Sequence, residues 1–162
     1  MSLTQLDEYV LKYIKKNRNN GLNHVMKVVT SPITLAVFII ITTCQLKSSQ
    51  KLKTVIRVVI TCLVMGQLVI KQLVKRPRPN ATYAIVKPLR DASYPSCHSM
   101  LAMAMATLSV KDALCVAPLC VFIASVISCS RVYVGVHYLS DVISGGVLGV
   151  CIANLYYKKK KR

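Results

Sequence analysis

The chain has 162 residues, 54% of them hydrophobic, and its mean hydropathy is +0.49. These values are typical of a one-domain membrane protein and exclude an ordinary soluble one. Only 5 acidic residues accompany 22 lysines and arginines, for a formal net charge of +17, and so few carboxylates argue against Mg²⁺ and two-metal sites.

The positive charge gathers at the ends of apolar stretches, which indicates anionic lipid headgroups rather than nucleic acid as its partner. The seven cysteines mostly lie inside apolar runs and form no Cys-x2-Cys pair. We interpret them as small apolar membrane residues.

The first twenty residues predict an amphipathic helix that lies on the membrane surface. Leu3, Val10 and Ile14 recur at helical spacing among charged side chains, which is typical of an interfacial helix within residues 1–20. A turn is expected over residues 17–23, where asparagines and a glycine cluster.

Five apolar stretches then predict membrane-spanning helices, at residues 28–46, 54–74, 96–110, 113–130 and 137–157. Pro32 is expected in the opening turns of the first helix, and Pro118 is expected to kink the fourth. Gly145, Gly149 and Ala153 place a ridge of small residues on the fifth, which favours close helix packing. We therefore predict an all-α integral membrane bundle, a single domain over residues 1–162.

Residues 75–95 form the one long polar loop, with four prolines and five cations. With five spans, this loop and the starts of the third and fifth helices lie on the same side of the membrane. The other side receives a second group of cations: Lys47, Lys51, Lys53, Lys111 and the basic tail, residues 158–162. The positive-inside rule assigns that side to the cytoplasm, which makes the polar-loop side extracytoplasmic.

Three polar motifs stand on this extracytoplasmic side: Lys71-x6-Arg78-Pro79, Pro95-Ser96-Cys97-His98 and Ser130-Arg131-x5-His137-x3-Asp141. His137 and Asp141 are four residues apart, so on a helix they share a face, and the carboxylate can accept a hydrogen bond from one ring nitrogen. The other ring nitrogen is then a nucleophile. With a second imidazole and three fixed cations, this is what phosphoryl transfer needs.

The order and spacing of these motifs resemble the signature motifs of the type 2 phosphatidic acid phosphatase family, membrane lipid phosphate phosphatases that share a core with vanadium haloperoxidases. The resemblance implies that His137 attacks phosphorus to form a phosphohistidine, that Asp141 orients it, and that His98 protonates the leaving group. It implies that no metal or cofactor takes part. The phosphate-binding residues it implies are Lys71, Arg78, Ser96, Cys97 and Arg131.

Cys97 departs from the family pattern, which has glycine at this position. Its backbone N–H is expected to remain a donor, while a narrowed pocket, an altered substrate range and reduced activity all stay open. Cys97 is not expected to be a nucleophile, because Met103 stands where a Cys-x5-Arg phosphatase loop needs arginine. Lys75 and Arg76 are interpreted as attracting headgroups, and His24 as an interfacial residue.

The predicted function is metal-independent hydrolysis of a phosphomonoester or pyrophosphate on a lipid. The sequence does not rank isoprenyl diphosphates such as undecaprenyl diphosphate against phosphatidic acid or phosphatidylglycerophosphate. A compact chain of this kind resembles the bacterial members of the family, which implies a bacterial plasma membrane protein. The bilayer and the lipid phosphate are its expected partners, nucleic acid is not one, and the oligomeric state stays open. The alternatives are a catalytically degenerate membrane protein with a binding or structural role and, more remotely, a vanadate-binding oxidase.

Overall fold

The computed structural model describes residues 2–45, 49–87 and 90–157, and over these residues it is helical without a strand. The all-α prediction is confirmed. Lys47 and the basic tail lie outside the described residues. The elements are α1 (Leu3–Lys16), α2 (Asn20–Val29), α3 (Pro32–Gln45), α4 (Ser49–Leu63), the π-helix η1 (Val64–Ile70), α5 (Lys71–Val74), the 3₁₀ helix η2 (Ala81–Tyr83), α6 (Cys97–Lys111), α7 (Ala117–Tyr133) and α8 (Leu139–Tyr156).

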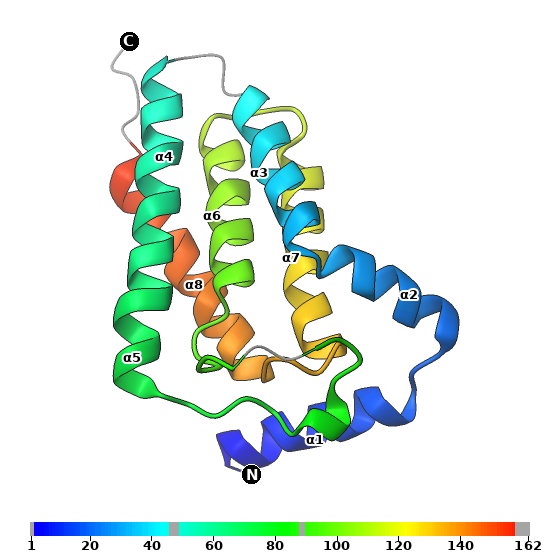
Figure 1. The fold of residues 1–162 in the computed structure, drawn as a ribbon. Coiled ribbons are helices and arrows are strands. Elements are labelled where there is room, and N and C mark those ends of the chain that lie inside the picture. The colour runs from blue at the N-terminus through cyan, green and yellow to red at the C-terminus, as the bar shows by residue number, and fades with distance from the viewer. Residues whose placement is uncertain (1, 46–48, 88–89, 158–162) are drawn as a thin grey trace.

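Helix α6 is the centre of the bundle, with α3, α4, α7 and α8 packed around it (Figure 1). Most of its side chains are buried, among them Met100 and Met105, and a stripe at Met103, Thr107 and Val110 is partly or fully exposed. Helix α6 is 15 residues long and contains two serines and a threonine. The surrounding helices separate most of it from lipid, so these polar side chains are tolerated.

Helices α6 and α8 approach closely at the ridge of small residues. A side chain on Gly149 would begin 2.0 Å from the carbonyl oxygen of Met100, and one on Gly145 would begin 2.5 Å from that of Ser96. Ala153 is fully buried one turn further on. The predicted ridge therefore holds the start of α6 against α8.

Two helical stretches within the described residues have the length and hydropathy of a membrane span, Ser49–Val74 and Leu139–Tyr156. The pair α2 and α3 is long enough together but bends by 55°, and α7 is a shorter apolar helix. Large apolar side chains on the outside, such as Phe122 and Leu155, face outward as they do in lipid-exposed helices.

Several predicted boundaries are wrong. The expected turn is shorter, because α2 begins at Asn20, and α2 ends just before Pro32, which starts a new helix rather than lying inside one. Pro118 lies in the first turn of α7, where it needs no hydrogen-bond partner and produces no kink. The second span begins at Ser49, five residues earlier than its hydropathy indicates.

Helix α1 lies across one end of the bundle, beneath the loops that join α5 to α6 and α7 to α8 (Figure 1). Leu11 on its apolar face packs with Val132 and Val142. The amphipathic pattern predicted for a membrane surface is thus used in part to cover the bundle.

Candidate active site

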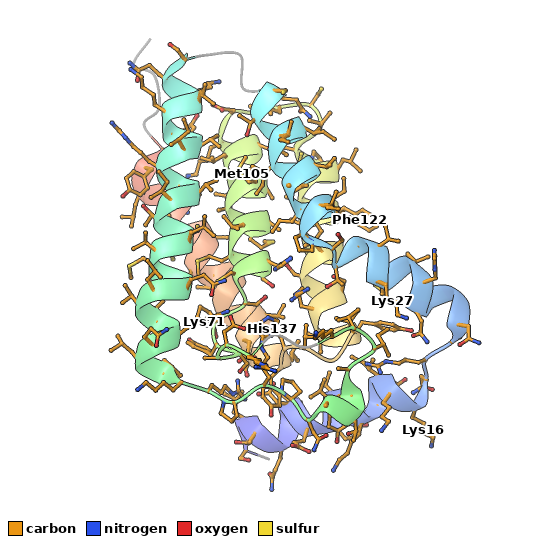
Figure 2. The ribbon with its side chains drawn as sticks, in the orientation of Figure 1. Lys16, Lys27, Lys71, Met105, Phe122 and His137 are labelled. Carbon is orange, nitrogen blue, oxygen red and sulfur yellow. The ribbon has the colours of Figure 1, made fainter. Side chains whose placement is uncertain are left out.

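Backbone hydrogen bonds bring the three motifs together at the end of the bundle that α1 covers. The N–H of Ser96 donates to the carbonyl oxygen of Asp141 at 3.1 Å, which joins the second motif to the third. The N–H of Ser93 donates to the carbonyl oxygen of Arg76 at 2.8 Å, which joins the polar loop to the first. Figure 2 shows Lys71 and His137 at this same end.

His137 lies in the short connection before α8, two residues ahead of the helix that was expected to contain it. The connection turns at Gly135, whose φ of 77° is costly for other residues and whose missing side chain lets the backbone of Tyr83 pass. His137 is 2% exposed, with Nδ1 3.6 Å from Oδ2 of Asp141 and Nε2 3.3 Å from Nη1 of Arg78.

These contacts define the tautomer of His137. Arg78 can only donate, so Nε2 presents its lone pair and Nδ1 carries the proton toward Asp141. The 3.6 Å separation is longer than a hydrogen bond, as is common in active sites without substrate. Burial lowers the pKa of His137 from 6.5 to about 4, and the charges of Arg131 and Arg78 act in the same direction against Asp141. The imidazole is therefore neutral at neutral pH, as a nucleophile requires.

Lys71 and Arg78 of the first motif meet at Asp91, an acidic residue that the sequence analysis did not assign to the site. Nζ of Lys71 donates to Oδ2 of Asp91, and Nη2 of Arg78 donates to Oδ1 at 2.7 Å. Although partial burial opposes ionisation, these two donors hold the pKa of the Asp91 carboxyl below its ordinary value. A carboxylate thus lies between the two cations expected to hold phosphate.

The second motif forms the N-terminus of α6. Ser96 is the N-cap residue, fully buried, and its Oγ accepts a hydrogen bond from Oγ of Ser99 at 3.0 Å. Cys97 points its sulfur toward η1, where a side chain on Gly66 would begin 2.7 Å from Sγ. Nε2 of His98 is buried without a hydrogen-bond partner among the described residues, within electrostatic range of His137, Arg131 and Lys71.

Arg131 is held by the end of α2. Its Nη1 donates to the carbonyl oxygen of Thr30 at 3.1 Å and to its Oγ1 at 2.5 Å. The structure therefore brings the charge of Arg131 close to both imidazoles while part of its guanidinium is engaged by Thr30.

Arg76 corrects the sequence interpretation, which assigned it to headgroup attraction. Its Nη1 donates to Oδ1 of Asp141 at 2.6 Å, and its Nη2 donates to Oδ2 of Asp7 at 2.8 Å. Asp7, expected on the polar face of a surface helix, is 1% exposed. The pairs Asp7–Arg76 and Arg76–Asp141 are separated by 69 and 65 positions, so no local pattern could have revealed them.

A cavity of about 660 Å³ opens beside Lys71 and Arg78. Its lining contains five cations: Lys71, Lys75, Arg76, Arg78 and Arg90. Within the part of the chain that the structure describes, no three His, Cys, Asp or Glu side chains cluster so as to hold a metal ion. The cavity is suited to an anion such as phosphate.

The fold and site define an all-helical membrane bundle with two histidines and a group of cations at one end. Comparison with known families agrees: the profile of the PAP2 superfamily matches residues 52–162. The chain belongs to the PAP2 superfamily, which confirms the resemblance of its motifs.

Known relatives support the assignment. An undecaprenyl-diphosphatase of Sulfolobus acidocaldarius is 37% identical over 101 residues, which are 59% of this chain and 48% of the relative. The chain thus spans about half the length of that curated relative.

Two solved structures share the fold. One is the transmembrane PAP2-type phosphatidylglycerolphosphate phosphatase of Bacillus subtilis, with a TM-score of 0.78 at 28% identity over 95% of this chain and 84% of that one. The other is LpxE of Aquifex aeolicus, with a TM-score of 0.75 at 23% identity over 91% and 92%; at this identity it supports the fold alone.

Proposed function

We propose that the chain is a membrane lipid phosphatase that hydrolyses a phosphomonoester or pyrophosphate through a phosphohistidine at His137. The observation that carries the proposal is the neutral, buried imidazole of His137, with Nδ1 facing Asp141 and Nε2 beside Arg78. Family membership supports phosphatase chemistry at this site.

In the first step Nε2 of His137 forms a bond to phosphorus as the bond to the lipid oxygen breaks. His98 gives its proton to that oxygen, and the approach of a phosphate anion favours the protonated imidazole that this requires. Lys71, Arg78 and Arg131 stabilise the charge that develops on the phosphoryl oxygens, and the free N–H groups at the start of α6 add to them.

In the second step a water molecule attacks the phosphohistidine. His98 now accepts the water proton, the P–N bond breaks, and inorganic phosphate and the original imidazole are restored. Asp91 lies between Lys71 and Arg78, where the phosphate group is proposed to bind. The substrate must therefore displace the Asp91 carboxylate to reach both cations.

An apolar groove of about 400 Å³ runs between α7 and α8 and is suited to the hydrocarbon chain. Val142, which follows Asp141 in the sequence, lines its end, and Val147 and Val150 continue along α8. The groove thus follows α8 from its first turn, near Asp141, toward the opposite end of the bundle. An isoprenyl diphosphate, phosphatidic acid or phosphatidylglycerophosphate would each combine an anionic head with such a chain.

The site end of the bundle is proposed to face away from the cytoplasm. Lys51 and Lys53 in the first turns of α4, and Lys111 at the end of α6, lie at the opposite end (Figure 1). Lys51 pairs with Asp112 at 2.9 Å, but the excess of cations there still favours the cytoplasmic side.

A phosphate-release panel tests this proposal. Purified protein is assayed in EDTA with isoprenyl and glycerolipid phosphates, comparing the native chain with His137→Ala, Cys97→Gly and the exposed control His24→Ala. We expect release in EDTA, at least about a 10³-fold loss in His137→Ala, and no change in His24→Ala.

Two outcomes contradict the proposal. Loss of activity in EDTA argues against metal-free catalysis, and absence of release from every lipid favours a catalytically degenerate binding protein. Faster turnover in Cys97→Gly would show that Cys97 restrains the site.

A further inference from the structure

Arg76 lies within the first motif, at one of the positions between Lys71 and Arg78 to which no catalytic role was assigned, and it is enclosed on several sides at the candidate active site. Its guanidinium lies 4.1 Å from the centre of the Tyr138 ring. Nη1 donates to Oγ of Ser140 at 2.7 Å in addition to Asp141, and Nη2 donates to Asp7. A cation that only attracted headgroups would instead extend into solvent.

The two carboxylates that Arg76 joins come from opposite ends of the chain. Asp7 in α1 and Asp141 in α8 are both almost completely buried. Asp7 also accepts a hydrogen bond from the N–H of Ser140 at 3.0 Å and another from its hydroxyl. Without a cation between them, these two buried carboxylates would repel each other.

The hydrogen bonds of Asp141 divide between its two oxygens. Oδ1 accepts from Arg76, whereas Oδ2 accepts from the N–H of Tyr138 at 3.0 Å and faces Nδ1 of His137. Arg76 therefore fixes the rotation of the carboxylate, which leaves Oδ2 directed at the imidazole.

From this geometry we propose that Arg76 is a positioning residue: it keeps Asp141 ionised and directed at Nδ1 of His137, and Asp7 of α1 holds it in place. The inference rests on the proposed function for its catalytic consequence. It gives α1 a role in the site, since the helix supplies the carboxylate that anchors the arginine.

Steady-state kinetics with Arg76→Gln and Arg76→Lys provide the first test, with the exposed Arg57→Gln as the matched control. We expect Arg76→Gln to lower kcat by about 10²-fold while KM stays within about threefold, because a misdirected nucleophile slows chemistry rather than binding. Arg76→Lys should recover part of kcat, and Asp7→Asn should lower it less than Arg76→Gln. A folded Arg76→Gln protein with unchanged kcat overturns the proposal.

A double substitution separates positioning from general support of the fold. Asp141→Asn combined with Arg76→Gln removes one negative and one positive charge together, so the net charge of the cluster is unchanged. The double variant can therefore be measured even if Arg76→Gln alone does not fold. If Arg76 acts through Asp141, the double variant should match Asp141→Asn within about threefold. Losses that multiply would overturn the proposal.

A spectroscopic measurement tests the inference without relying on activity. The chain has three histidines, so ¹⁵N-histidine spectra in detergent can be assigned by single substitution. The ring-nitrogen shifts of His137, which report its tautomer, should change in Arg76→Gln and not in Arg57→Gln. Unchanged shifts contradict the inference, whereas a native chain inactive on every lipid contradicts only the proposed function.

Discussion

Asp91 lies between Lys71 and Arg78, where both cations neutralise its carboxylate. It is 36% exposed, so water screens these pairs and an incoming anion can compete with them. We therefore expect Asp91 to compete with phosphate for Lys71 and Arg78 at the proposed site.

Removing this charge should strengthen the binding of anions. We expect Asp91→Asn to lower the inhibition constant of inorganic phosphate by about tenfold, because two cations lose their internal partner. Asp112→Asn is the matched control, since Asp112 pairs with Lys51 at the other end of the bundle. Equal phosphate inhibition in the native chain and in Asp91→Asn would show that the Asp91 carboxylate does not compete with phosphate for Lys71 and Arg78.

The lowered pKa of His137 predicts a pH dependence of stability. The folded value is about 4 against an ordinary 6.5, so between these values the unfolded chain binds more protons than the folded one. Stability should therefore fall as the pH falls from about 6.5 toward 4, by up to about 1.4 kcal/mol per pH unit from this group.

The measurement compares melting temperatures in detergent at about pH 7.5 and about pH 5. The native chain should lose more stability on acidification than His137→Gln, which has no group to titrate. An equal loss in both proteins would rule out a depressed pKa at His137.

At the residue level, the spacing of polar residues in the sequence predicted which side chains would lie together at one end of the bundle. The pair His137–Asp141 and the cations Lys71 and Arg78 lie at the predicted end of the bundle. Asp91, Arg76 and Asp7 were missed because their contacts join segments that only the folded chain brings together. A buried aspartate on an amphipathic helix cannot be distinguished from an exposed one by periodicity alone.

At the level of elements, the missing side chain of Gly66 in the π-helix η1 leaves the space that Cys97 fills. Gly66 lies in η1 and faces the sulfur of Cys97. The glycine that the family has in the second motif is thus matched here by a glycine on the facing helix. This pairing explains how a larger residue can stand at the start of α6 with its sulfur packed against Gly66.

Substitutions at Gly66 and Cys97, made singly and together, test this packing. Gly66→Ala should destabilise the protein by about 1–3 kcal/mol, because the new methyl group would begin 2.7 Å from the sulfur. Cys97→Gly in the same chain should recover most of this loss. The control Gly146→Ala meets Met103 at 3.4 Å, close to an ordinary contact. If Gly66→Ala melts like the native chain, Cys97 does not depend on Gly66.

The helices themselves were predictable where apolar runs are continuous, and their ends were not. Hydropathy found α8 and the end of the second span, but the break between α2 and α3 depends on Pro32 starting a helix. The first turns of α4 carry lysines, so composition alone placed their start too late. Residue 135 turns the chain ahead of α8, which leaves His137 outside the helix in which its spacing placed it.

Across the molecule, the residues of the candidate active site gather at one end of the bundle, and the opposite end carries Lys51, Lys111 and Asp112. Segments that begin at Lys71, Ser96 and Arg131 meet there, and α1 covers them. In the proposed function, the anionic head of the lipid binds at this end and its hydrocarbon chain lies in the groove between α7 and α8. Topology rules predicted this meeting, because alternate helix ends must share a side, whereas the cover by α1 required the folded structure.

Trapping the reaction intermediate tests the central claim most directly. Turnover of a lipid carrying radioactive phosphate is quenched in alkali, and the labelled peptide is sequenced. The account predicts an acid-labile, alkali-stable label on His137 that is absent from His137→Ala. Label on another residue, or turnover without any label, would contradict it.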